Sequence, residues 1–234
     1  MFEFTNGKKR YIVGIDEAGR GPVIGPLVIC AFVVEAEKHQ DLKKMGAKDS
    51  KLTSKNLRKS LYTELKAFAT DIKVKHISPA EIDELRKTHS LNVIEQQIML
   101  KLVKKINVEL SEIYIDAADV NEKRFGGVFE KEFPNATVIS KHKADMLFPV
   151  VSAASIIAKV ERDQVIELLN SSIDGDLGSG YPADPKTKAF LREYFSKHKK
   201  FPPYVRESWD TVKRIRKEFL DSKLTDYFDS KKRS

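Results

Sequence analysis

Residues 10–20 read RYIVGIDEAGR and residues 26–35 read PLVICAFVVE, and these two stretches decide the fold. Both are short, apolar and rich in β-branched side chains, which is typical of strands that are buried on both faces of a sheet. The segment GRGPVIGP at 19–26 is dense in glycine and proline, so it predicts a break between them. We therefore expect two consecutive central strands.

Outside these stretches, strand patterns alternate with helical patterns. Further strands are predicted at 72–77, 112–117 and 136–141. Helices are predicted at 54–70, 79–87, 91–109, 152–169, 185–198 and 207–221. The helix at 152–169 begins with small residues, which let a backbone come close to a neighbour or a ligand. The pattern predicts an α/β fold, with a core domain over 1–175, a small C-terminal helical region over 176–221 and a polar, basic, untethered tail over 222–234.

Composition and charge narrow the function classes. The chain has 234 residues, 41% of them hydrophobic, which is enough for a sizeable core. It has no apolar run of about 18 residues and no signal-peptide pattern, so we expect a cytoplasmic protein with no membrane span. The net charge of +8 favours a polyanionic partner, nucleic acid first, although a generic solvated basic surface explains the charge equally well. The only cysteine, Cys30, excludes a disulfide within one chain and is expected to pack as a small hydrophobe.

Two predicted strands end in acidic residues. Asp16 and Glu17 end the strand YIVGIDE, and Asp116 ends the strand EIYIDA. A buried carboxylate is costly unless it is paired or bound to a cation. Each acid alone could instead turn to solvent or cap the next helix. Two such strands make a shared function more plausible than coincidence.

Asp145, in SKHKADMLFPVV, is a further candidate that follows the last predicted strand. An N-cap role for it is at least as plausible as catalysis. If the three strand ends converge, repulsion among the acids raises some of their pKa values unless a cation offsets it. Carboxylates without a nearby Cys or His pair favour Mg²⁺ or Mn²⁺ over zinc, and two such ions can promote phosphodiester hydrolysis.

Five motifs together resemble the type 2 ribonucleases H, in the form of the archaeal branch. They are GIDEAGRGPVIGPLVI at 14–29, KDSKLT at 48–53, YIDA at 114–117, HKADMLFPVVSAASIIAKVERD at 142–163 and GSGYPADP at 178–185. The resemblance implies a ribonuclease H-like mixed β-sheet flanked by helices, followed by the small C-terminal helical region. It implies that Asp16, Glu17, Asp116 and Asp145 are the catalytic, metal-binding acids. The implied activity is metal-dependent cleavage of the RNA strand of RNA–DNA hybrids and 5′ of ribonucleotides embedded in duplex DNA, leaving 5′-phosphate and 3′-hydroxyl ends.

The same resemblance suggests how substrate is bound. Gly19, Arg20 and Gly21 match an element whose backbone reaches the ribose 2′-hydroxyl, although a tight turn alone could explain both glycines. Tyr181 matches a tyrosine that stacks at the ribonucleotide–deoxyribonucleotide junction, whereas its sequence context alone suggests a loop anchor. Lys51, with Arg20 as a second candidate, is expected to contact phosphate, whereas the assignment of Lys48 is weaker because most surface lysines are only solvated.

The tail contains a possible partner motif. Leu224, Tyr227 and Phe228 are spaced like a sliding-clamp-binding box, with Asp221 where the box usually has Gln. A one-turn helix would put these three on one face, for a clamp or equally for the protein's own core. We expect a monomer. The alternatives to the main function are a non-catalytic hybrid-binding subunit and another nuclease of the ribonuclease H superfold that acts on DNA.

Overall fold

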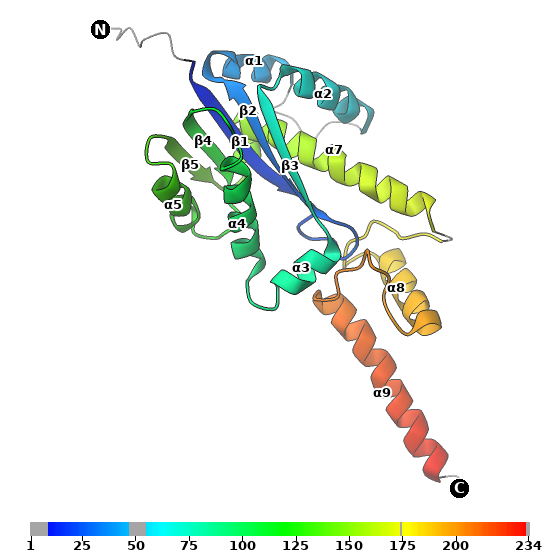
Figure 1. The fold of residues 1–234 in the computed structure, drawn as a ribbon. Coiled ribbons are helices and arrows are strands. Elements are labelled where there is room, and N and C mark those ends of the chain that lie inside the picture. The colour runs from blue at the N-terminus through cyan, green and yellow to red at the C-terminus, as the bar shows by residue number, and fades with distance from the viewer. Residues whose placement is uncertain (1–8, 47–54, 174, 233–234) are drawn as a thin grey trace. The chain divides into compact units, whose positions relative to one another are not determined.

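A mixed five-stranded sheet organises the larger part of the chain (Figure 1). The structure is a computed structural model, and it describes residues 9–46, 55–173 and 175–232. The strands are β1 Tyr11–Ala18, β2 Leu27–Glu35, β3 Asp71–Ile77, β4 Leu110–Asp116 and β5 Thr137–Lys141. Their order across the sheet is β3-β2-β1-β4-β5; β1 is antiparallel to β2 and parallel to β4, which is parallel to β5. The predicted mixed sheet is confirmed.

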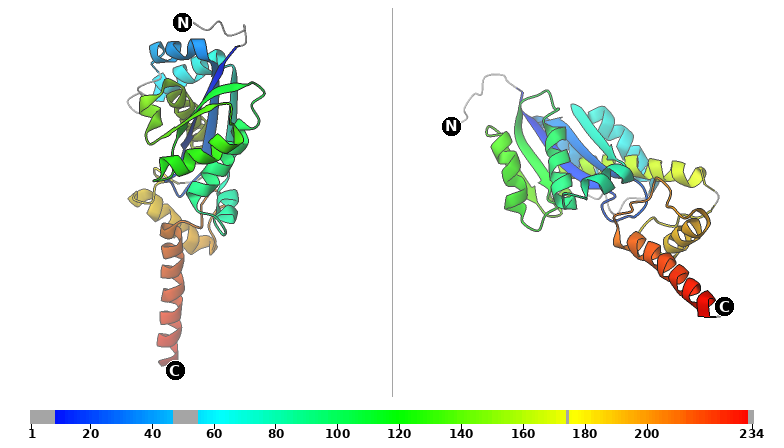
Figure 2. Two further views of the ribbon diagram at one scale, coloured as in Figure 1. Left: turned by 90° about the vertical axis from the view of Figure 1, so that its left-hand side faces the viewer. Right: turned by 60° about the horizontal axis from the view of Figure 1, so that its bottom comes forward.

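Helices cover both faces of this sheet (Figures 1 and 2). One face packs on α1 His39–Lys44, α2 Lys55–Phe68 and α7 Pro149–Ser171, whose buried apolar side chains form one cluster with those of β1 and β2. The other face carries α4 Leu91–Val103 and α5 Glu122–Glu132. In α5, the Cβ position of Gly126 lies 2.8 Å from Cβ of Ser140 in β5. The central strands are therefore buried on both faces, as their continuous apolar runs predicted.

The chain divides into two compact units. The first comprises Met1–Ala18, Val28–His76 and Ser90–Asp163, and the second comprises Gly19–Leu27, Ile77–His89 and Gln164–Ser234. The second unit contains the whole of α3 Pro79–Leu85, α8 Pro185–His198 and α9 Asp210–Lys232. Its own apolar core joins the loop after β1 to the C-terminal helices through Val23, Ile24, Leu177, Leu191, Phe195, Phe201, Val205, Val212 and Ile215. The GRGPVIGP segment thus belongs to the same compact unit as the C-terminal helices.

Several elements differ from the sequence-based expectation. The short helices η1 Ala36–Lys38, α1 and α6 Ala144–Leu147, together with α5, were not predicted. Helix α4 ends at Val103 rather than near 109, and α9 continues to Lys232 rather than ending near 221. The backbone of the predicted tail is therefore helical through Lys232.

Two further expectations concern burial and membranes. Cys30 is completely buried in β2, and burial, with the charge of Asp16, raises the pKa of its thiol well above the usual value. The predicted role of Cys30 as a packing residue is confirmed.

Of the helices that the structure describes, none has a stretch long and apolar enough to cross a membrane.

Candidate active site

The register of β1 and β4 brings two of the predicted acids together. Ile15 pairs with Ile115 in the parallel ladder, and Asp16 and Asp116 are the next residue in each strand. Because parallel neighbours in register point their side chains to the same face, both carboxylates project from the same end and face of the sheet. The sequence predicted an acid at the end of each strand, and the structure adds that the two strands are neighbours in register.

Asp16 is held in a buried environment on the face covered by α7. It is 5% exposed, and its Oδ1 accepts a hydrogen bond of 2.7 Å from the backbone N–H of Glu17. It also accepts a hydrogen bond from Ser155 of α7. Burial, and then the nearby charges of Glu17 and Asp116, raise the pKa of the Asp16 carboxyl well above its usual value. Asp16 is therefore no solvent-facing strand-end acid.

The approach of α7 to β1 depends on a glycine. A Cβ atom on Gly14 would lie 2.3 Å from the carbonyl carbon and oxygen of Val150. The helix continues with the small residues Ser152, Ala153 and Ala154, all buried. The tight packing that these small residues predicted is therefore present, and it brings Ser155 to Asp16.

The backbone just before Asp145 is hydrogen-bonded to the side chain of Asp116. Asp145 is 3% exposed and is the second residue of α6. The N–H of its neighbour Ala144 donates to Oδ1 of Asp116 at 3.3 Å. The N-cap of α6 is Lys143, in the left-handed conformation with φ of 54°. Asp145 is thus not the N-cap, so the alternative of a capping role does not hold.

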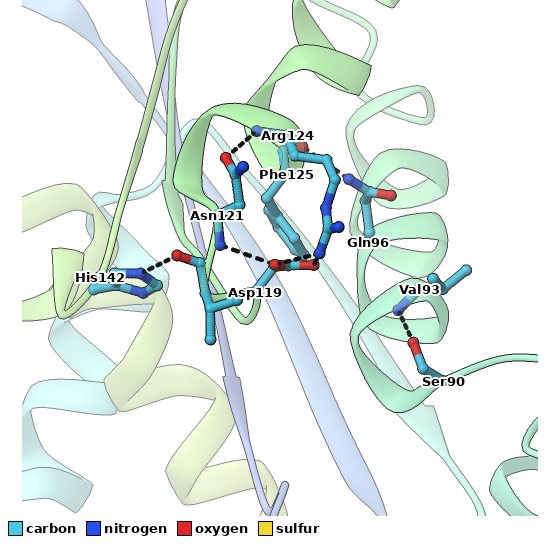
Figure 3. Close-up of polar contacts among 9 residues, drawn as sticks. Ser90, Val93, Gln96, Asp119, Asn121, Arg124, Phe125 and His142 are labelled. Carbon is cyan, nitrogen blue, oxygen red and sulfur yellow. Dashed lines mark hydrogen bonds and ion pairs between the residues drawn. The ribbon is translucent and has the colours of Figure 1, made fainter.

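The loop after Asp116 is fixed by a polar cluster that the sequence did not reveal (Figure 3). Asp119 is buried, and its Oδ1 accepts from Nη2 of Arg124 at 2.7 Å and from the N–H of Asn121 at 2.9 Å. The N–H of Asn121, and then Arg124, lower the pKa of the Asp119 carboxyl. Gln96 of α4 donates to the carbonyl of Phe125 at 2.9 Å. These contacts anchor the chain between β4 and α5.

The donor set fits a hard divalent cation by its chemistry. Asp16, Glu17, Asp116 and Asp145 offer carboxylate oxygens only, which Mg²⁺ and Mn²⁺ accept readily. A cation would also offset the repulsion that raises the pKa of Asp16. Within the described ranges, no group of three or more His, Cys, Asp or Glu side chains has the arrangement of a ready-made metal site. The acids thus share an end of the sheet, while their role as a common ligand set stays a prediction.

The predicted substrate-binding residues that the structure describes lie together in the second unit. Gly19 has φ of +89°, a conformation that favours glycine. Gly21 is exposed, and the position of its missing Cβ lies 3.4 Å from Cε1 of Tyr181. Tyr181 itself is 46% exposed, as a stacking residue must be. Lys51 and Lys48, with the whole motif at 48–53, lie outside the described residues.

The loop that carries Tyr181 is held by Asp184 and Thr187. Oδ2 of Asp184 accepts from the N–H of Ser179 at 2.5 Å, and Oγ1 of Thr187 accepts from the N–H of Gly180 at 3.0 Å. Asp184 is also the N-cap of α8, where Oδ1 accepts from the N–H of Lys186. The loop is therefore joined to the start of a helix, which limits where the Tyr181 ring can lie.

Comparison with known proteins identifies relatives over most of the chain. The sequence model of the family Ribonuclease HII matches residues 13–212. Ribonuclease HII of Pyrococcus furiosus is 46% identical over 205 residues, covering 87% of this chain and 90% of that protein. The crystal structure of ribonuclease H2 from Pyrococcus horikoshii OT3 superposes with a TM-score of 0.85 at 43% identity, covering 90% of this chain and 99% of that one.

A second solved structure is a complex. The structure of the PCNA:RNase HII complex from Archaeoglobus fulgidus contains a chain with a TM-score of 0.77 and 38% identity. The match covers 88% of this chain and 96% of that one. Sequence and fold thus agree over nearly the full length of each relative, and the chain belongs to the ribonuclease HII family.

Proposed function

We propose that this chain is a divalent-metal-dependent endoribonuclease. It cuts the RNA strand of RNA–DNA hybrids and cuts 5′ of ribonucleotides embedded in duplex DNA, leaving 5′-phosphate and 3′-hydroxyl ends. Membership of the ribonuclease HII family supports this function over the two alternatives, a non-catalytic hybrid-binding subunit and a nuclease for DNA alone. The observation that carries it is the parallel register of Ile15 with Ile115, which puts Asp16 beside Asp116.

In this proposal the four acids, Asp16, Glu17, Asp116 and Asp145, hold the cation. When bound, Mg²⁺ or Mn²⁺ supplies activation of the attacking water and stabilisation of the leaving 3′-oxygen. The protein's part is to orient the carboxylates. Ser155 and the N–H of Glu17 fix the Asp16 carboxylate, and the N–H of Ala144 binds the Asp116 carboxylate. Side chains fixed in this way lose little entropy when the cation binds.

Substrate selection falls to the loop and to basic residues. Gly19, Arg20 and Gly21 are proposed to read the 2′-hydroxyl, which distinguishes RNA from DNA at one nucleotide. Tyr181 is proposed to stack on the adjoining sugar or base, and Lys51 to bind phosphate. The Tyr181 ring lies close to Gly21, 3.4 Å from the position that a Cβ would take there, and this proximity supports a shared task for these elements. The net charge of +8 favours nucleic acid as the partner.

One assay tests this function. A DNA duplex with a single ribonucleotide is incubated with and without Mg²⁺, beside an all-DNA duplex of the same sequence. We expect a metal-dependent cut 5′ of the ribonucleotide and none in the control duplex. Cleavage of both duplexes would favour a DNA nuclease, and tight binding without cleavage would favour a hybrid-binding subunit.

Variants of the acids test the site itself. Asp16→Asn and Asp145→Asn should each abolish cleavage while duplex binding persists, because they remove a charged ligand and keep the side chain's shape. Asp41→Asn is the matched control, since Asp41 lies on α1 and pairs with Lys44 at 2.8 Å. Cleavage by the Asp16 and Asp145 variants at the control's rate would eliminate the assignment.

A replication clamp is the proposed protein partner. Leu224, Tyr227 and Phe228 have the spacing of a clamp-binding box, and they fall within α9. The Archaeoglobus fulgidus relative was solved as a complex with PCNA, which supports a partner of this kind. We expect the chain itself to be a monomer.

The clamp proposal is tested by a double substitution. Tyr227→Ala with Phe228→Ala should lower affinity for PCNA at least tenfold without changing cleavage of free duplex. Lys231→Ala with Lys232→Ala is the control of equal size. Unchanged PCNA affinity in the aromatic variant would remove the proposal, and a drop in its unfolding temperature would instead favour packing on the protein's own core.

A further inference from the structure

Arg206 is a fully buried arginine whose side chain binds backbone carbonyls of the loop after β1. Its Nη2 donates to the carbonyl of Gly19 at 2.7 Å, its Nη1 to that of Arg20 at 3.2 Å, and its Nε to that of Gly25 at 2.9 Å. It is 0% exposed. A guanidinium is the one side chain with enough donors in a rigid plane to hold three carbonyls at once.

The backbone around Arg206 reinforces this attachment. The N–H of Arg206 donates to the carbonyl of Val23 at 2.9 Å, and the N–H of Val23 donates to the carbonyl of Gly180 at 2.8 Å. Ile24 forms a bridge with Val205. The loop at 19–25, the segment at 205–206 and the start of the Tyr181 loop are therefore tied together within one compact unit.

Trp209, the only tryptophan of the chain, is hydrogen-bonded to the next carbonyl of the loop, that of Gly21. Its indole Nε1 donates to the carbonyl of Gly21 at 3.1 Å. The guanidinium carbon atoms of Arg206 and Arg86 lie 4.8 Å and 4.6 Å from the centre of its ring. Cation–π contact at these distances restrains both the indole and the Arg206 side chain.

The carbonyl contacts determine where the N–H groups of the loop point. In a trans peptide the C=O of one residue and the N–H of the next point in opposite directions. With the carbonyls of Gly19 and Arg20 turned to Arg206, the N–H groups of Arg20 and Gly21 must face away from it. The positive charge of the Arg206 guanidinium also polarises these two peptides, which makes their N–H groups stronger donors.

We infer that Arg206 and Trp209 are positioning residues that aim the N–H groups of Arg20 and Gly21 at the oxygen of a ribose 2′-hydroxyl. The inference rests on the proposed function, because it concerns the same substrate. Neither side chain touches the substrate in this scheme. They act by orienting peptides that are flanked by glycine on both sides of Arg20, where the backbone has more conformational freedom than at other residues.

Two conservative substitutions test the inference. Trp209→Phe removes the hydrogen bond to the Gly21 carbonyl and keeps an aromatic ring for the two arginines. Arg206→Lys keeps the charge but cannot hold three carbonyls at once. Arg192→Lys is the matched control, because Arg192 makes a half-exposed pair with Glu218 at 3.0 Å in the same unit.

The measured quantity is the preference for ribose, given by the ratio of affinities for a duplex with one ribonucleotide and for the same all-DNA duplex, in EDTA. We expect the preference to fall about five- to tenfold in Trp209→Phe and Arg206→Lys, or about 1–1.4 kcal/mol. Affinity for the all-DNA duplex should stay within about twofold of the wild type. The control should keep the full preference.

The outcomes separate positioning from a merely structural role. Equal loss of affinity for both duplexes, or retention of the preference in Trp209→Phe, would overturn the inference and leave the proposed function standing. If Arg206→Lys fails to fold, Trp209→Phe alone decides. A wild-type protein that binds the two duplexes equally in EDTA would also overturn the inference, whereas the Mg²⁺-dependent cleavage assay decides the proposed function separately.

Discussion

Gly14 of β1 lies directly beneath Val150 of α7, so that a Cβ on Gly14 would be only 2.3 Å from the Val150 carbonyl carbon. The atoms in the way belong to the helix backbone, which cannot turn aside as a flexible side chain can. Asp16 lies two residues after Gly14, and its partner Ser155 lies five residues after Val150. The geometry of the carboxylate therefore depends on this one close approach.

Gly14→Ala should lower the free energy of unfolding by about 1–3 kcal/mol, because the added methyl group must push α7 away from β1. Urea denaturation measures the change. Gly127→Ala is the matched control: it lies inside α5, its nearest neighbour at the Cβ position is Glu130 Oε2 at 4.0 Å, and alanine favours helix. If the two variants were equally stable, the close approach would not exist as described.

Ser155→Ala should leave the fold intact and slow cleavage by about 10-fold or more, since partners that orient a metal-binding carboxylate have effects of that size. The hydroxyl of Ser155 donates to Asp16, whereas alanine suits the interior of α7 well. Single-turnover cleavage and thermal unfolding should be measured together. A rate equal to that of the wild type would mean that Asp16 is oriented without Ser155.

Asp16→Asn should raise the unfolding temperature in EDTA, because it removes a buried charge from beside Glu17 and Asp116. Mg²⁺ should then stabilise the wild type and not the variant; at 100 times its Kd, a ligand of the folded state adds about 2.7 kcal/mol. Thermal melts with and without Mg²⁺ provide the comparison, with Asp41→Asn as control. Equal stabilisation of the wild type and Asp16→Asn by Mg²⁺ would place the cation elsewhere.

The lowered pKa of Asp184 predicts that the stability of the folded protein, through the Tyr181 loop, depends on pH. The N–H of Ser179, and then its side chain, lower the pKa of the Asp184 carboxyl from 3.8 to about 2. Because the folded pKa is below the unfolded one, this stabilisation is complete above about pH 4 and is lost as the pH falls toward about 2. Asp184→Asn should therefore melt earlier than the wild type at pH 7.

The difference between Asp184→Asn and the wild type should shrink below pH 4 and vanish near pH 2. Melting curves at pH 7, 4 and 3 suffice to follow the trend, and Asp41→Asn controls for a carboxylate far from this loop in sequence. A difference that stayed constant from pH 7 to pH 3 would contradict the role of the Asp184 charge. A difference in melting temperature that grew as the pH fell would contradict that role more strongly.

Much of the fold could be predicted because its decisive segments carry strong local signals. The unbroken apolar runs of β1 and β2 are long enough to be strands buried on both faces. Helix α8 was predicted at 185–198 and spans Pro185–His198, since Asp184 supplies the cap and proline suits the first turn. Helix α5 was missed because Gly126 and Gly127 weaken its helical pattern, although Gly126 is what lets it lie on β5.

The candidate site was predictable where it follows from strands and not where it follows from long-range packing. Asp16 and Asp116 end apolar strands, and that pattern can be read along the sequence. Arg206, in YVRESW, resembles any exposed charged residue, because nothing near it in sequence indicates that its partners lie at Gly19 and Arg20. Trp209 gave the one available signal, as a lone tryptophan in a charged segment.

The attachment of Arg206 to Gly19 spans 187 positions of the sequence, and this has a consequence for biosynthesis. A nascent chain has made all five strands by residue 141, long before Arg206 is translated. The sheet can thus form on the ribosome while the loop after β1 still lacks the side chain that secures it. A chain truncated before residue 206 would keep all four candidate acids and yet lack that anchor, so we expect the loop after β1 to become fixed only in the last stage of maturation.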